Sequence, residues 1–160
     1  MLKILKKITV FSGTALALIV GLIAFNYYFP PTYEANFQLP KTNSHIILQL
    51  QPMHFFLAEY KRSIVLRKDG LPDQKLELFP DTGGYLRTQV YQSGDGKFMV
   101  KGYFDAAGID TKDHKLLPYQ TATVDSSIYL GAFDDSTEGK WSFLPAPQSA
   151  EQKLQAGGAN

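Results

Sequence analysis

The clearest structural signal in the chain is a hairpin pattern over residues 85–104, which read YLRTQVYQSGDGKFMVKGYF. In its first arm, one set of alternate residues is apolar or small and the other set is larger and more polar: Leu86, Thr88 and Val90 against Tyr85, Arg87, Gln89 and Tyr91. The second arm sets Phe98, Val100 and Phe104 against Lys97, Met99, Lys101 and Tyr103. The Ser-Gly-Asp-Gly segment between the arms is typical of a turn. Because alternate residues of a strand point to opposite faces, each arm predicts a strand with one buried face.

Shorter stretches with the same two-residue period lie on both sides of this hairpin. They cover residues 46–51, 63–67, 75–79, 127–133 and 140–144, and glycine-containing turns at 68–70 and 81–84 separate some of them. We interpret the polar residues 105–115 as a loop, and we expect Trp141 and Phe143 to close the core. The pattern predicts an all-β domain over residues 43–147, a small antiparallel sandwich or barrel of about six to eight strands. Residues 148–160 contain few apolar side chains, so we expect a flexible tail there.

The N-terminus has the pattern of a membrane anchor. Lys3, Lys6 and Lys7 precede Ile8–Phe25, which is almost wholly apolar, and Pro30 and Pro31 follow. About 20 apolar residues suffice for a helix to cross a bilayer. The pattern therefore predicts a transmembrane signal-anchor helix over residues 8–29 and an extended linker over residues 30–42. A cleavable secretory signal is the alternative, but its usual small residues are missing at the end of the apolar run.

The lysines also predict an orientation. The basic residues 1–7 place the N-terminus in the cytoplasm by the positive-inside rule, so the β domain faces the periplasm or the cell exterior. We expect a single-pass protein of the inner (plasma) membrane. Gly13, Ala17 and Gly21 share one face of the helix, where small side chains allow a second helix to approach closely. Small residues are also simply common in membrane helices, which is the alternative interpretation.

Composition excludes several classes of function. The 160 residues contain 16 basic and 15 acidic side chains, a formal charge of +1, which does not favour a nucleic-acid partner. Without cysteine there is no thiolate nucleophile and no cysteine-bound metal. The spacing of His45 and His54 fits no common metal motif, and the acidic runs after Asp105 and Asp134 lack the order of a calcium loop. We therefore expect neither a metal nor another cofactor.

One short motif suggests catalysis. Asp81-Thr82-Gly83 follows Phe79, and Tyr129-Leu130-Gly131 lies further along the chain. This pattern resembles the Asp-Thr-Gly signature of aspartic proteases, although Pro80 and Gly84 depart from that family's pattern. The resemblance implies a membrane-tethered homodimeric protease in which two copies of Asp81 share a proton. The same three residues also form an ordinary turn.

The remaining functional signal is the distribution of aromatic and arginine side chains. Several lie on the strand phase opposite the expected core, and we predict that they contact a partner: Tyr60, Arg62, Tyr85, Arg87, Tyr91, Tyr103 and Tyr129. Tyrosine and arginine are enriched at recognition surfaces. The alternative is a second buried face covered by a neighbouring sheet. The sequence thus favours a non-enzymatic binding or assembly module, an accessory subunit of a bacterial envelope membrane complex with a protein partner, over the protease that uses Asp81.

Overall fold

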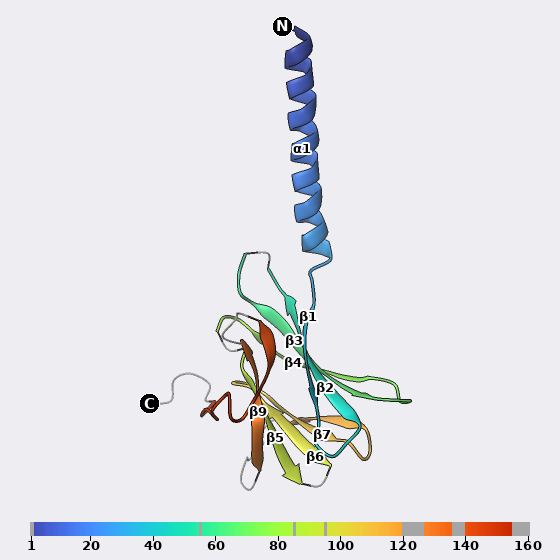
Figure 1. The fold of residues 1–160 in the computed structure, drawn as a ribbon, viewed down its shortest axis with the longest axis vertical. Helices are drawn as coiled ribbons and strands as arrows, with labels where there is room; N and C mark the ends of the chain where they lie inside the picture. Colours follow the sequence, from blue (N-terminus) through green and yellow to red (C-terminus); the bar gives the residue numbers. More distant parts are fainter. Residues whose placement is uncertain are drawn as a thin grey trace.

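The protein folds into one long helix and two antiparallel sheets (Figure 1). The computed structural model describes residues 2–54, 56–84, 86–94, 96–119, 127–135 and 140–154, with helix side chains from Thr14 onward except that of Asn26. The helix α1 covers Leu2–Tyr28. The strands are β1 (Tyr33–Gln38), β2 (Ser44–Pro52), β3 (Tyr60–Lys68), β4 (Gln74–Asp81), β5 (Thr88–Gly94), β6 (Lys97–Lys101), β7 (Ala106–Asp110), β8 (Lys115–Tyr119), β9 (Ile128–Asp135) and β10 (Trp141–Pro145).

The two sheets pack face to face as a β-sandwich. One is four-stranded in the order β1-β2-β3-β4, and the other is six-stranded in the order β10-β9-β5-β6-β7-β8. The first sheet supplies Ile46, Leu48, Ile64 and Leu66 to the shared core, and the second supplies Val90, Phe98, Val100, Ala107, Ile109 and Phe133. The predicted all-β domain is therefore confirmed, and of the two predicted forms it is a sandwich and not a barrel, with one face of each sheet in the core. The described residues form ten strands, more than the six to eight expected.

The predicted hairpin over residues 85–104 is confirmed where the structure describes it. β5 pairs with β6, and Gly94 faces Lys97 across the turn. Val90 and Phe98 lie in the core, as the alternation predicted. Trp141 and Phe143 of β10 pack against the core, and the Phe143 ring stacks on Phe37 of β1 at a centroid distance of 3.7 Å. This contact closes one edge of the sandwich.

Three strands, β1, β7 and β8, lie where the sequence predicted none. The predicted linker over residues 30–42 contains β1, which pairs with β2 along its whole length and buries Ala35. The predicted loop over residues 105–115 contains β7, which pairs with both β6 and β8. In β7 the inward positions are Ala107 and Ile109. Strand pairing was missed there because the segment combines alanine and glycine with polar neighbours, a composition unfavourable for strands in isolation.

The helix α1 projects from the sandwich by itself (Figure 1). It ends just before Pro30, a residue that has no backbone N–H with which to continue a helix. Its exposed apolar side chains include the neighbours Leu18, Ile19 and Val20, which point to different sides of the helix because successive residues are about 100° apart. Within the part of the chain that the structure describes, no helix combines the length and the hydropathy needed to cross a membrane.

The C-terminal segment differs from the flexible tail predicted over residues 148–160. After β10 the chain turns, with Ser149 N–H donating to the Pro145 carbonyl at 3.0 Å. Residues 149–154, here called the C-terminal strap, then lie against the six-stranded sheet, and Ser149 and Leu154 are buried. The prediction was wrong for these residues because the strap is held through its main chain, which composition does not reveal. Residues 155–160 lie outside the described part.

Candidate functional site

The most distinctive polar surface of the domain is the outer face of β5 and β9, opposite the core. Arg87, Gln89 and Tyr91 lie there, since the intervening Thr88 and Val90 point inward, and all five side chains are buried. Tyr129 of β9 lies beside Tyr91, with ring centroids 5.5 Å apart. We call the four residues Arg87, Gln89, Tyr91 and Tyr129 the β5–β9 face. Figure 1 shows the C-terminal segment, in red, beside these strands.

The β5–β9 face binds the main chain of the C-terminal strap at three successive points. The Tyr129 hydroxyl donates to the Ser149 carbonyl at 3.0 Å, and Arg87 Nη2 donates to the Ala150 carbonyl at 2.6 Å. Gln89 then forms a pair of hydrogen bonds with Gln152: its Nε2 donates to the carbonyl at 2.9 Å, and its Oε1 accepts from the N–H at 2.7 Å. A side-chain amide thus binds both polar groups of one strap residue.

Tyr91 adds the contact to a strap side chain. Its hydroxyl donates to Glu151 Oε1 at 3.0 Å and accepts from Gln89 Nε2 at 2.8 Å. Burial, and next the hydrogen bond to Glu151, raise the pKa of the Tyr91 hydroxyl far above its usual range. The neutral hydroxyl is therefore the form that the bound strap requires.

Arg87 is the centre of the charge arrangement on this face. Its Nη1 pairs with Asp134 of β9, and its Nη2 also donates to the Tyr129 hydroxyl at 3.2 Å. The Arg87 side chain is 8% exposed and that of Asp134 is 31% exposed, so the ion pair is buried on the arginine side and open to water on the aspartate side. Asp134 fixes the plane of the guanidinium and thereby aims Nη2 at the strap.

Of the predicted partner-contact residues, the structure brings Arg87, Tyr91 and Tyr129 together. Arg62 lies elsewhere, between the two sheets, because it shares the inward phase of β3 with Ile64 and Leu66. Its side chain is 1% exposed, and its guanidinium donates to Thr88 Oγ1 at 2.6 Å and to Asp105 Oδ2 at 3.3 Å. Burial lowers the pKa of Arg62, and the charges of Asp105 and Asp81 oppose this effect. Arg62 thus forms its contacts inside the domain, and the prediction that it contacts a partner was wrong.

The other predicted residues are dispersed. Tyr60 begins β3 and contacts Tyr33 edge to face, and Tyr103 is half-buried in the turn between β6 and β7, while Tyr85 lies outside the described residues. Ala17 and Gly21 are exposed on α1, and the surroundings of Gly13 are outside the described part. No element of the described chain covers the predicted helix-packing face at Ala17 and Gly21.

Asp81, the residue of the protease alternative, is at the end of β4 and 1% exposed. Its Oδ1 accepts a hydrogen bond from Gly83 N–H at 3.0 Å, the arrangement of an aspartate that closes a turn. Gly83 and Gly84 both have positive φ, which favours glycine there. The carboxylate is buried, and its charge acts on the buried guanidinium of Arg62, so this arrangement favours a structural task for the Asp-Thr-Gly segment.

The sequence interpretation missed part of the site. Gln89 shares the strand phase of Arg87 and Tyr91, so the alternation contained a signal for it. Asp134 and the strap carried none, because an aspartate before a turn and a polar C-terminus are both common. Among the described residues, no cluster of three or more His, Cys, Asp or Glu side chains is arranged to hold a metal ion. No family model, curated protein or solved structure matches the chain.

Proposed function

We propose that the chain is a single-pass membrane protein whose outward-facing β-sandwich is a binding or assembly module, an accessory subunit of a bacterial envelope membrane complex. On this proposal α1 is the uncleaved anchor in the inner membrane, with the N-terminus in the cytoplasm. The lysines before the apolar residues 8–25 support the anchor and its orientation. The apolar side chains exposed around α1 support it too, because water is an unfavourable solvent for such a surface.

The proposal includes a recognition site, the β5–β9 face, whose ligand is an extended peptide segment. The observation that supports this most is the set of bonds from Tyr129, Arg87 and Gln89 to strap main-chain atoms. Main-chain groups are common to every peptide, so a face that binds them accepts an extended segment of many sequences. Buried polar side chains are costly without partners. In this structure the chain's own strap supplies those partners, and on this proposal a partner's segment supplies them when the strap is displaced.

The test is to remove the strap and offer it back as a separate molecule. The full chain ending at Gln148, reconstituted in nanodiscs, is titrated with a fluorescent peptide that has the sequence of residues 147–154, and binding is followed by anisotropy. We expect saturable binding to the shortened chain and at least about tenfold weaker binding to the intact chain, since the strap occupies the face there. Gln89→Ala in the shortened chain removes both bonds to Gln152 and should abolish binding. Gln92→Ala, a change to a half-buried amide on the same strand that donates within its own turn rather than to the strap, is the matched control.

Two outcomes would contradict peptide recognition. One is a shortened chain that keeps the circular dichroism of the sandwich and does not bind the peptide. The other is a shortened chain that does not fold, because the strap would then be an integral part of the core structure rather than a replaceable ligand.

A further inference from the structure

The loop between β2 and β3 presents an exposed apolar tip. Phe56 is 80% exposed and Leu57 is 46% exposed, and Met53 at the start of the loop is also exposed. The base of the loop is fixed, since Met53 N–H donates to the Glu59 carbonyl at 2.8 Å and His54 Nε2 lies 3.1 Å from Glu59 Oε2. Residues 53–58 contain no Asp, Glu, Lys or Arg. The loop is thus held so that its apolar tip points away from the domain.

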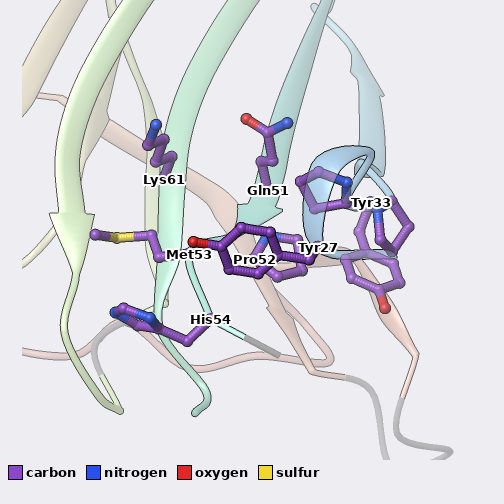
Figure 2. Close-up of a pocket in the computed structure, with 9 residues that line it drawn as sticks. Tyr27, Tyr33, Gln51, Pro52, Met53, His54 and Lys61 are labelled. Carbon is purple, nitrogen blue, oxygen red and sulfur yellow. The ribbon is translucent and has the colours of Figure 1, made fainter. Parts of the chain in front are cut away.

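This loop lies at the end of the domain where α1 joins it (Figure 1). A hollow of about 510 Å³ separates the two, lined by Tyr27, Pro30 and Pro31 on the helix side and by Pro52, Met53 and His54 on the loop side. Figure 2 shows Tyr27 and the loop residues around this same hollow. The end of the helix is itself aromatic and exposed, with Tyr27, Tyr28 and Phe29 each at least 68% exposed.

The short connection between helix and sandwich limits how far the loop can move from the end of α1. β1 begins at Tyr33, and α1 ends at Tyr28. The four residues between them span at most about 14 Å when extended. Where α1 leaves a bilayer, its aromatic residues sit at the headgroup level, which aromatic side chains favour. The apolar loop tip is then within reach of the same lipid surface.

We propose that the β2–β3 loop inserts Phe56 and Leu57 into the interfacial layer of the leaflet from which α1 emerges. The inference rests on the proposed anchor and adds a second membrane contact to it. The loop has the chemistry of a lipid contact: an apolar, uncharged tip on a fixed base, continuous with the aromatic end of a helix whose apolar side chains are exposed on several sides. Two attachments a short distance apart orient the sandwich relative to the membrane.

The test uses single cysteines, because the natural chain has none. Leu57→Cys and Leu71→Cys are a matched pair: both leucines are exposed, at 46% and 45%, but Leu71 follows the opposite end of β3, about 30 Å away along the strand. Val20→Cys reports on the anchor. Each full-length variant carries a nitroxide label in vesicles of phosphatidylcholine and phosphatidylglycerol. Spin resonance then measures collisions with oxygen, which concentrates in lipid, and with a water-soluble nickel chelate.

We expect labels at positions 20 and 57 to collide more with oxygen and the label at position 71 to collide more with the chelate. A label at position 57 exposed to the chelate while position 20 remains in lipid would overturn the loop contact and leave the anchor intact. A label at position 20 exposed to the chelate would overturn the anchor and, with it, the loop contact. Insertion of positions 57 and 71 alike would also overturn the inference, because it would show unspecific association of the domain with lipid.

Discussion

Tyr91 explains how a side chain that points away from the core becomes buried. It is 2% exposed, although it lies on the outer face of β5, because Glu151 of the C-terminal strap lies against its hydroxyl. That hydroxyl both donates to Glu151 and accepts from Gln89. A tyrosinate would still accept from Gln89, but it would have no proton to donate to Glu151 and would place a second negative charge against that carboxylate. Tyr91 therefore connects the protonation of one group to the docking of the strap.

The raised pKa of Tyr91 predicts a loss of stability at alkaline pH. The unfolded chain ionises this tyrosine near its usual pKa of about 10, while the folded chain keeps it neutral to higher pH. The stabilisation is therefore fully present below about pH 10 and is lost as the pH rises above it. Urea unfolding of the full chain in detergent at several pH values measures this slope, and Tyr91→Phe should make it shallower. Tyr33→Phe, which removes an exposed hydroxyl, is the control, and equal slopes in both variants would contradict the prediction.

Arg62 shows where residue-level sequence reasoning fails. The alternation over residues 85–92 correctly separated Val90 from Arg87 and Tyr91. In β3 the basic side chains suggested an outward position for Arg62, although it shares the phase of Ile64 and Leu66. Its partners Thr88 and Asp105 lie 26 and 43 residues away, so no local pattern reveals that a buried arginine would be satisfied there.

At the scale of elements, the buried arginine connects the two sheets. From β3 it reaches Thr88 at the start of β5 and Asp105 just before β7. Gly102 lies beside this pair, and a Cβ there would come within 2.4 Å of Asp105 Oδ1 and 2.9 Å of Arg62 Nη2. The glycine is thus required by the close approach of the charged groups.

Removing the arginine is expected to destabilise the sandwich strongly. Arg62→Met fills the space with an apolar chain and leaves the carboxylates of Asp105 and Asp81 buried without their guanidinium, a change that costs about 3–5 kcal/mol in comparable cases. Arg67→Met is the matched control on the same strand, because Arg67 pairs with Asp73 on the surface. Urea unfolding followed by circular dichroism compares the two. Equal free energies of unfolding for both variants would contradict an inter-sheet role for Arg62.

The sequence predicted the strands in which apolar and polar side chains alternate. β2, β5 and β6 alternate clearly and were expected. β1 is short and enclosed by prolines, and its partner β2 stabilises it through backbone pairing. The C-terminal strap has no regular secondary structure and is held by hydrogen bonds from side chains 63 residues earlier in the chain. The strap is therefore positioned by the β5–β9 face that binds it, and its own composition predicted only a tail.

At the scale of the whole molecule, the proposed accessory subunit has a helix and a domain that can each contact a partner. We expect native mass spectrometry of the full chain, extracted from its own membrane in nanodiscs, to find a larger membrane protein in fixed stoichiometry. Gly21→Leu should weaken this association by blocking close helix approach at the face shared by Gly13, Ala17 and Gly21. Ala15→Leu is the control, since position 15 lies about 160° around the helix from position 17. Recovery of the chain alone or only as a homodimer would contradict the accessory-subunit proposal.

Because the turn after β10 is short, the C-terminal strap is tethered close to the β5–β9 face and would compete there with any other peptide. Only the residues between Pro145 and Ser149 separate the last strand from the first bond to the β5–β9 face. A segment on so short a connection has an effective concentration on the order of millimolar. A partner's peptide free in solution would have to bind correspondingly tightly to take its place. On the proposed function, attachment to the same membrane would raise a partner's local concentration and so favour its exchange with the strap.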